Sequence, residues 1–300
     1  MSLQVVVDHP AFITVKSMIF LSATLGNAFI VFVILSAKHL RNERFNLLIM
    51  LLAFGDIIIG LGVPFQFLSQ FITNKEASGT CNLIREAITF YGDHVTQLAM
   101  LLIASDRLYV LFRLHKINHD RLYSVYIVAI IMVLIASTTP SILFISERFL
   151  FISNPTGLTF AKSLFLSYFV CITLFFNCTI IGLYLIIIIK YKHQMKQATR
   201  SSQNSFNRIV LGIVVVYFTM WCIPKWAGIA AVIDGCRGFL YELTFFVAPE
   251  TQLLSAVLNI IVYGYTHRDL RQAMWNCCLR LTGKHVSTVH VSVLSSRHTR

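Results

Sequence analysis

Long apolar runs alternate with short polar segments along almost the whole chain. Seven of these runs hold about 20 or more mostly apolar residues, the length that a helix needs to cross a hydrocarbon core roughly 30 Å thick. Lipid offers the peptide groups no hydrogen-bond partner, so a single spanning segment folds as a helix. The pattern predicts helical spans at 12–35, 47–72, 83–112, 122–145, 164–189, 209–233 and 243–265.

The composition argues against a water-soluble enzyme. Of the 300 residues, 56% are hydrophobic and only 13% are charged, whereas a soluble domain carries about 25% charged residues. The formal net charge of +12 could indicate nucleic-acid binding, but the basic residues lie in short clusters between the apolar runs. The cysteines show no metal-ligand spacing. We therefore expect membrane lipid as a partner, with no nucleic acid, cofactor, metal or enzymatic activity.

Basic residues lie mostly on one side of the predicted spans. The segments near 36–46, 113–121 and 190–208, with Arg107 and the tail from residue 266, hold 18 Lys and Arg and four acidic residues. The opposite side holds seven Lys and Arg and eight acidic residues. Lys and Arg concentrate in cytoplasmic loops. We therefore predict a multi-pass plasma-membrane protein with an extracellular N-terminal segment, 1–11, and a cytoplasmic C-terminus.

The chain changes character after the predicted transmembrane domain, 12–265. In 266–281, apolar residues recur at helical spacing against basic ones, which predicts a short amphipathic eighth helix on the inner membrane surface. Palmitates on Cys277 and Cys278 would strengthen its attachment, and two unmodified interfacial thiols are the alternative. The remaining segment, 282–300, is rich in Ser, Thr, His and Val and is predicted to be a disordered cytoplasmic tail.

Ionisable side chains inside a span are costly in lipid, which makes them candidates for function. Asp56 lies in the middle of the second span, with Asn27 and Asn259 at similar depth on the first and seventh. An ion site and polar contacts that only hold the helices together are both open interpretations. On the third span, helical phase places one polar stripe along the helix. Its members are Thr89, Asp93, Thr96 and Arg107.

Five short motifs occur in order on five of the predicted spans. They are Gly26-Asn27, Leu52-Ala53 before Asp56, Asp106-Arg107-Leu108, Phe218 with Trp221 and Pro224, and Asn259 with Tyr263. With this topology and charge, the chain resembles rhodopsin-like (class A) G-protein-coupled receptors over roughly residues 12 to 280. Some details depart from the usual motifs. Trp221, for example, lies one residue farther from Pro224 than the tryptophan of the usual sixth-span motif does. Such loosened motifs are similar to those of nematode serpentine chemoreceptors.

The resemblance implies roles for two sets of residues. The first set would rearrange on activation and open a cleft for a G protein, starting from a resting pair of Asp106 and Arg107. Its members are Asp106, Arg107, Tyr184, Trp221, Pro224, Asn259 and Tyr263. The second set resembles the family's sodium-binding cluster. Its members are Asp56, Thr96, Ser255 and Asn259.

An outer ligand pocket is also implied. The side chains expected to border it are Glu86, Thr89, Asp93, Lys225 and Glu250. For Asp93 and Lys225, a structural ion pair and contact with the ligand are equally open. The usual disulfide from the third span is excluded because no Cys lies between residues 82 and 170.

Two cysteines are expected on the outer side of the membrane. Cys81 begins the third span, and Cys236 lies in the last outer loop. We predict a disulfide between them, with two unpaired thiols as the alternative; the bond requires the Cα atoms to come within about 7 Å.

These inferences predict an all-α membrane protein, a seven-helix bundle with a short eighth helix. Its expected function is to transmit the binding of an extracellular small molecule or short peptide, in a chemosensory role, to a heterotrimeric G protein. The alternative is an ion channel or small membrane transporter that uses intramembrane acids such as Asp56 and Asp93. A transporter built from related halves would show an internal repeat, and the chain shows none.

Overall fold

The computed structural model describes residues 10–72, 75–112, 119–153, 158–195, 212, 214–233 and 239–282. Within these residues, every regular element is a helix. In chain order they are α2 (Pro10–Ser36), α3 (Lys38–Arg41), α4 (Arg44–Phe71), α5 (Lys75–Phe112), α6 (His119–Ala136), α7 (Thr138–Ser153), α8 (Leu158–Met195), the π-helical turn η2 (Phe218–Cys222), α10 (Ile223–Ile233), α11 (Phe239–Thr266) and α12 (Arg268–Leu281). The expected all-α architecture is confirmed for the described part of the chain.

Five helical segments of the described chain are long and apolar enough to cross a membrane, and the fourth runs through both α6 and α7. The qualifying segments are Pro10–Ser36, Arg44–Leu68, Gly79–Phe112, Tyr123–Glu147 and Ser167–Lys190. A shorter apolar helix covers Val214–Ala230. Helix α11 has 28 residues, but Glu250, Gln252 and Asn259 interrupt its apolar surface. Length and composition therefore support a multi-span membrane protein.

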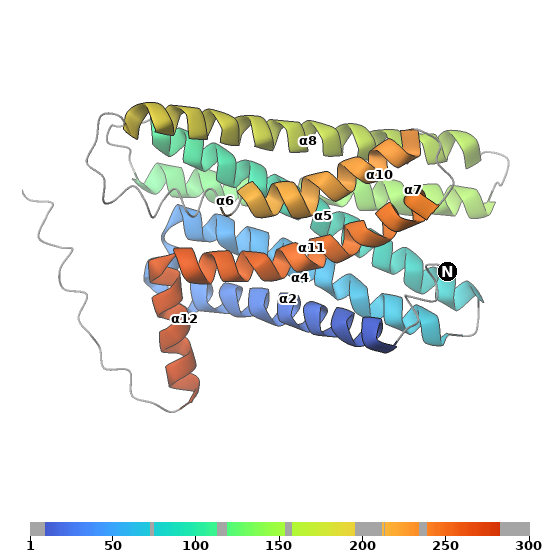
Figure 1. The fold of residues 1–300 in the computed structure, drawn as a ribbon, viewed down its shortest axis with the longest axis horizontal. Helices are drawn as coiled ribbons and strands as arrows, with labels where there is room; N and C mark the ends of the chain where they lie inside the picture. Colours follow the sequence, from blue (N-terminus) through green and yellow to red (C-terminus); the bar gives the residue numbers. More distant parts are fainter. Residues whose placement is uncertain are drawn as a thin grey trace, which may run out of the picture.

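The long helices run side by side as a bundle, and α12 leaves it at a steep angle (Figure 1). Helix α4 packs against both α2 and α5, and α11 lies against α2 and α10. Apolar side chains that point out of the bundle are exposed, as on α6, where Val125, Val128 and Met132 are each about 60% exposed. Such a surface is expected where lipid takes the place of water.

Two glycines allow α4 and α5 to approach closely. A Cβ atom on Gly92 of α5 would lie 2.7 Å from the Ile59 side chain and 2.9 Å from its backbone nitrogen on α4. A Cβ atom on Gly55 would lie 2.5 Å from the Thr96 hydroxyl. Small residues permit close packing of helices inside a membrane, where no hydrophobic force drives them together. This packing brings Thr96 beside the turn of α4 that carries Asp56.

The fourth span is interrupted at Ser137, between α6 and α7. Pro140 has no N–H to donate to the carbonyl of Ala136, so the regular ladder cannot continue through this point. Ser137 is bonded to the last turn of α6, since its N–H and its hydroxyl both donate to the Val133 carbonyl, at 2.9 and 2.8 Å.

Candidate functional site

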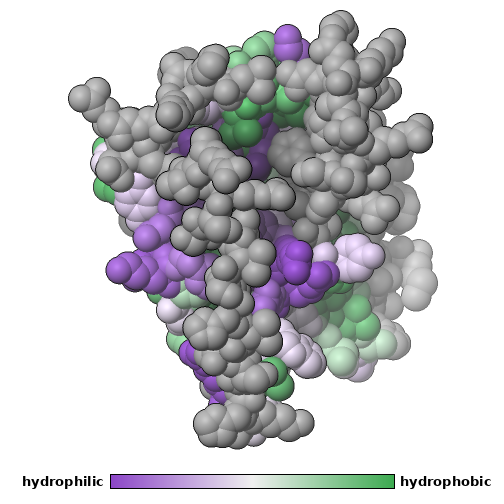
Figure 2. Space-filling model, turned by 90° about the vertical axis from the view of Figure 1, so that its left-hand side faces the viewer, coloured by the Kyte–Doolittle hydropathy of each residue, from purple (hydrophilic) through white to green (hydrophobic). Residues whose placement is uncertain are grey.

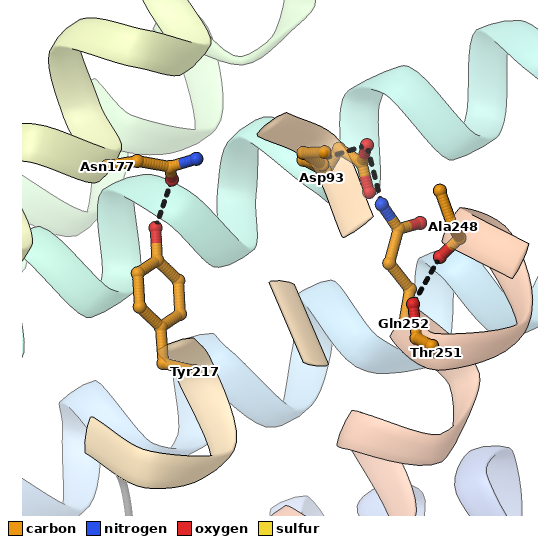
Figure 3. A network of polar contacts seen from close by, with 7 residues as sticks. Asp93, Asn177, Tyr217, Ala248, Thr251 and Gln252 are labelled. Atoms are coloured by element: carbon orange, nitrogen blue, oxygen red, sulfur yellow. Dashed lines mark hydrogen bonds and ion pairs between the residues drawn. The ribbon is translucent and has the colours of Figure 1, made fainter. Parts of the chain in front are cut away.

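A buried ion pair joins α5 to α10 in the half of the bundle far from α12. The ammonium of Lys225 donates to Asp93 Oδ2 at 3.0 Å, and both side chains are buried. The amide of Gln252 on α11 points at the same carboxylate and donates to Oδ2 at 3.4 Å (Figure 3). The Lys225 ammonium also lies 4.1 Å from the ring centroid of Trp221. The structure contains the ion pair, and contact of Asp93 or Lys225 with a ligand stays a prediction.

A second ion pair joins α2 to α11. The ammonium of Lys16 bonds Glu250 Oε1, and Lys16 is only 5% exposed. Hydropathy gave no sign of Lys16, because one basic residue near the end of an apolar run is common. One ion pair thus links α5 to α10, and the other links α2 to α11.

Glu86 and Thr89, the remaining predicted pocket residues, each form a hydrogen bond within α5. Glu86 accepts from Arg85, its neighbour on α5, at 3.2 Å. The Thr89 hydroxyl donates to the Arg85 carbonyl at 2.8 Å. Both side chains are partly buried.

The four residues that resemble a sodium cluster are all buried in the middle of the bundle. The amide of Asn259 donates to Asp56 Oδ2 at 3.1 Å, which ties α11 to α4. Asp56 Oδ1 and Thr96 Oγ1 have no hydrogen-bond partner among the described residues. Asn27, at the same depth, donates instead to backbone carbonyls of Ala23 and Ala256, at 2.9 and 3.3 Å. It therefore links α2 to α11 without contacting the carboxylate.

At the end of the bundle near α12, Arg107 contacts an acid and an aromatic ring. Its Nε lies 3.7 Å from Asp106 Oδ2, which is the expected resting pair at long range. The shorter bond to Asp106 comes from the Tyr126 hydroxyl, which donates to Oδ1 at 2.5 Å. The Arg107 guanidinium carbon lies 3.4 Å from the ring centroid of Phe45 on α4. The sequence motifs gave no indication that Tyr126 and Phe45 belong to this site.

The Phe45 ring connects Arg107 to the start of α12. It stacks on the His267 ring, with centroids 5.8 Å apart and an interplanar angle of 23°. His267 Nδ1 accepts from the Leu270 N–H at 3.3 Å and so caps α12. Burial, with the nearby charge of Arg107 acting in the same direction, lowers the pKa of His267, although Asp269 opposes the shift. An acceptor at Nδ1 and a lowered pKa both favour neutral imidazole.

Helix η2 resolves the unusual spacing of Trp221 and Pro224. The Ile223 N–H donates to the Phe218 carbonyl, five residues back, so this turn holds one residue more than an α-helical turn. Trp221 is buried and stacks on Tyr217, with centroids 6.1 Å apart. π-Helical turns are common at functional sites.

Two tyrosines predicted to rearrange, Tyr184 and Tyr263, are buried at 2% and 1% exposure. Neither hydroxyl has a hydrogen-bond partner among the described residues. A buried hydroxyl without a partner is costly, so both groups gain if a rearrangement supplies one.

Comparison with known families decides the class. A family model described as serpentine type 7TM GPCR chemoreceptor Srsx matches residues 20–278. The chain belongs to the Srsx family. No curated protein matches the chain. The predicted resemblance to serpentine chemoreceptors is confirmed, and the Srsx description of seven transmembrane helices agrees with the seven apolar runs.

In this Srsx receptor, two predicted cysteine modifications involve different parts of the chain. Cys277 is partly buried and Cys278 is exposed on α12, which leaves Cys278 accessible. Cys81 is partly buried on α5, while Cys236 lies outside the described residues. The disulfide and the palmitoylation stay predictions.

Proposed function

We propose that this Srsx receptor transmits binding of an extracellular small molecule or short peptide to a heterotrimeric G protein. The observation that carries the proposal is a continuous series of contacts from the buried ion pair to the π-helical turn. Asp93 contacts Lys225, Lys225 lies over Trp221, and Trp221 stacks on Tyr217. A ligand that shifts α5 relative to α10, with this pair intact, therefore acts on the helix that begins at η2.

The orientation of the chain is part of the same proposal. Exposed basic side chains gather at the end of the bundle that carries α12, among them Lys38, Arg41, Arg268 and Arg271. Figure 2 looks at this end and shows hydrophilic residues clustered there. The positive-inside rule places this end in the cytoplasm. Arg107 then faces the compartment in which G proteins are found, and α12 lies on the inner leaflet.

The Asp56 cluster fits a regulatory cation in this proposal. Asp56 Oδ1, Thr96 Oγ1 and the Ser255 hydroxyl are hard oxygen ligands at one depth, and the first two are without a described partner. Hard oxygens are the ligands that alkali and alkaline-earth cations prefer.

The test is receptor-driven nucleotide exchange on a purified G protein. Arg107→Ala should retain surface expression and lose coupling, because an apolar stub cannot replace a planar guanidinium. Lys190→Ala is the control, since it removes a positive charge from α8 at an exposed position. Unchanged exchange in Arg107→Ala at equal surface density would reject G-protein coupling through this residue.

The channel or transporter alternative predicts a different readout. Reconstituted vesicles would show ion flux that Asp56→Asn abolishes, with no effect of guanine nucleotides. Flux without nucleotide exchange would replace the receptor proposal.

A further inference from the structure

Contacts join three helices in a ring within the outer half of the bundle. From α5, Asp93 bonds Lys225 of α10 at 3.0 Å. From η2, Trp221 stacks on Tyr217, whose hydroxyl donates to Asn177 of α8 at 2.6 Å. On α8, the Phe176 side chain packs edge to face against the His94 imidazole of α5, with centroids 6.2 Å apart. This contact closes the ring of contacts between the helices.

Polar atoms without partners are concentrated on the helices of this ring. All belong to side chains that are at most 4% exposed. They are Asp93 Oδ1, His94 Nδ1 and Nε2, Gln97 Nε2 and Oε1, Thr173 Oγ1 and Asn177 Nδ2. In Figure 3 the free amide nitrogen of Asn177 points away from Tyr217 toward the side on which Asp93 lies.

Spacing places these groups within reach of a common occupant. Asp93, His94 and Gln97 lie within an arc of about 100° on α5, with Gln97 one turn deeper. Thr173 and Asn177 are one turn apart on the buried side of α8. Buried polar groups in native proteins nearly always have a partner, from protein, water or ligand. Protein supplies none here among the described residues.

On α2, α5, α10 and α11, the charged side chains that the structure describes in this half form three ion pairs. Lys225 is paired with Asp93, Lys16 with Glu250 and Arg85 with Glu86. A ligand with a net charge would therefore lie in the bundle without a counter-charge, or would have to break one of the buried pairs. Removing one partner of a buried pair is strongly unfavourable, because the other charge is left uncompensated.

We propose that the occupant of this ring is a small uncharged molecule with both hydrogen-bond donors and acceptors, bound by His94, Gln97, Thr173 and Asn177. The inference deepens the proposed function, because it names the ligand class of the same receptor. His94 and the two amides provide donors and acceptors, and the rings of Tyr168 and Phe176 around His94 provide an apolar wall. Asp93 and Lys225 then stay paired in the occupied site and position Trp221.

The test compares probes that share one ring and differ in charge. Nicotinamide is uncharged with donors and acceptors, nicotinate is an anion, 3-(aminomethyl)pyridine is a cation, and 3-ethylpyridine is uncharged with no donor. Each is added at about 10 mM to the purified full-length receptor in lipid nanodiscs, and the unfolding temperature is measured. Nicotinamide should raise it by about 2–4 °C, the shift expected if the probe is at about ten times its dissociation constant, and the other three should raise it less.

Matched variants on α8 locate the effect. Thr173→Val removes a buried hydroxyl that has no described partner and should abolish the nicotinamide shift. Thr179→Val is the control, because the Thr179 hydroxyl donates to the Phe175 carbonyl of its own helix at 2.7 Å and is not part of the ring. Gln97→Leu should abolish the shift as well.

Three results would overturn the inference. One is a larger shift with nicotinate or with the amine. Another is no shift with any of the four probes, which would mean that water alone occupies the ring. The third is a nicotinamide shift that survives Thr173→Val and Gln97→Leu. The unfolding measurement needs no G protein, so it tests ligand binding separately from coupling. Absence of nucleotide exchange would reject the proposed function without affecting the conclusion on the ligand class.

Discussion

The stacking of Arg107 on Phe45 predicts a restraint on the resting receptor. Phe45→Leu keeps an apolar side chain of similar size and removes the aromatic face that lies 3.4 Å from the guanidinium carbon. A cation–π contact contributes about 0.5–2 kcal/mol, depending on how far it is desolvated. If the contact belongs to the resting state alone, its loss raises a minor active population about two- to thirtyfold. We therefore expect Phe45→Leu to increase nucleotide exchange without ligand.

The assay is basal exchange on G protein at matched surface density. Phe45→Tyr keeps the aromatic face and should behave like the wild type. Phe71→Leu is the control for loss of a ring, since Phe71 is 82% exposed at the end of α4. An unchanged or lower basal rate in Phe45→Leu would refute the reasoning and leave the Asp106 contacts as the restraint.

At this end of the bundle, acidic side chains restrain Arg107 only weakly. Many receptors that the chain resembles carry an acid at the inner end of the sixth span, opposite the arginine. The corresponding residue here, 20 positions before Pro224, is Asn204, and the sequence has no acid between Glu147 and Asp234. Asn204 is therefore predicted to offer Arg107 at most a neutral hydrogen bond. Asn204 lies outside the described residues. Asp106 is engaged more closely by Tyr126 than by Arg107. The contact of the guanidinium with the Phe45 ring therefore adds a restraint that does not depend on an acid.

Two further predictions concern α12 and the packing of α4 on α5. Burial lowers the pKa of His267, so its neutral form is favoured by folding and its contribution is lost as pH falls below about 6.5. Amide hydrogen exchange in the first turn of α12, corrected for intrinsic rates, should become faster as the pH is lowered. His267→Asn keeps a capping acceptor and should remove this dependence on pH. Gly92→Ala should lower stability by about 1–3 kcal/mol, because its Cβ meets backbone on α4. Gly182→Ala meets nothing within 4 Å and should be neutral or stabilising by thermal unfolding; equal effects of the two would contradict the packing argument.

The fold was predictable from the sequence because lipid imposes a simple rule. Apolar length alone marks a span, so the runs at 12–35 and 47–72 match α2 and α4 within a few residues. The interruption at Ser137 was missed, because hydropathy treats 122–145 as one run and takes no account of the missing N–H of Pro140.

The site was predictable only in part because contacts between helices depend on rotation and packing. Helical phase placed Asp93 on an inward stripe, and the structure buries it against Lys225. The same phase placed Thr89 there, yet its hydroxyl is bonded within α5. Phe45 and Lys16 carried no signal, because a ring or a lysine near the end of an apolar run is common.

The spacing of Trp221 and Pro224 shows how a sequence motif can be displaced without losing its contacts. Counted along a regular α-helix, the additional residue would rotate everything before it by about 100°. The π-helical turn absorbs that residue locally, so Tyr217, Trp221 and Lys225 are all buried. Tyr217 can then bond α8 while Lys225 bonds α5, both from one helix. π-Helical turns are rare in proteins, and they occur frequently at functional sites. The displaced motif thus places the π-helical turn directly beside the buried pair of Asp93 and Lys225.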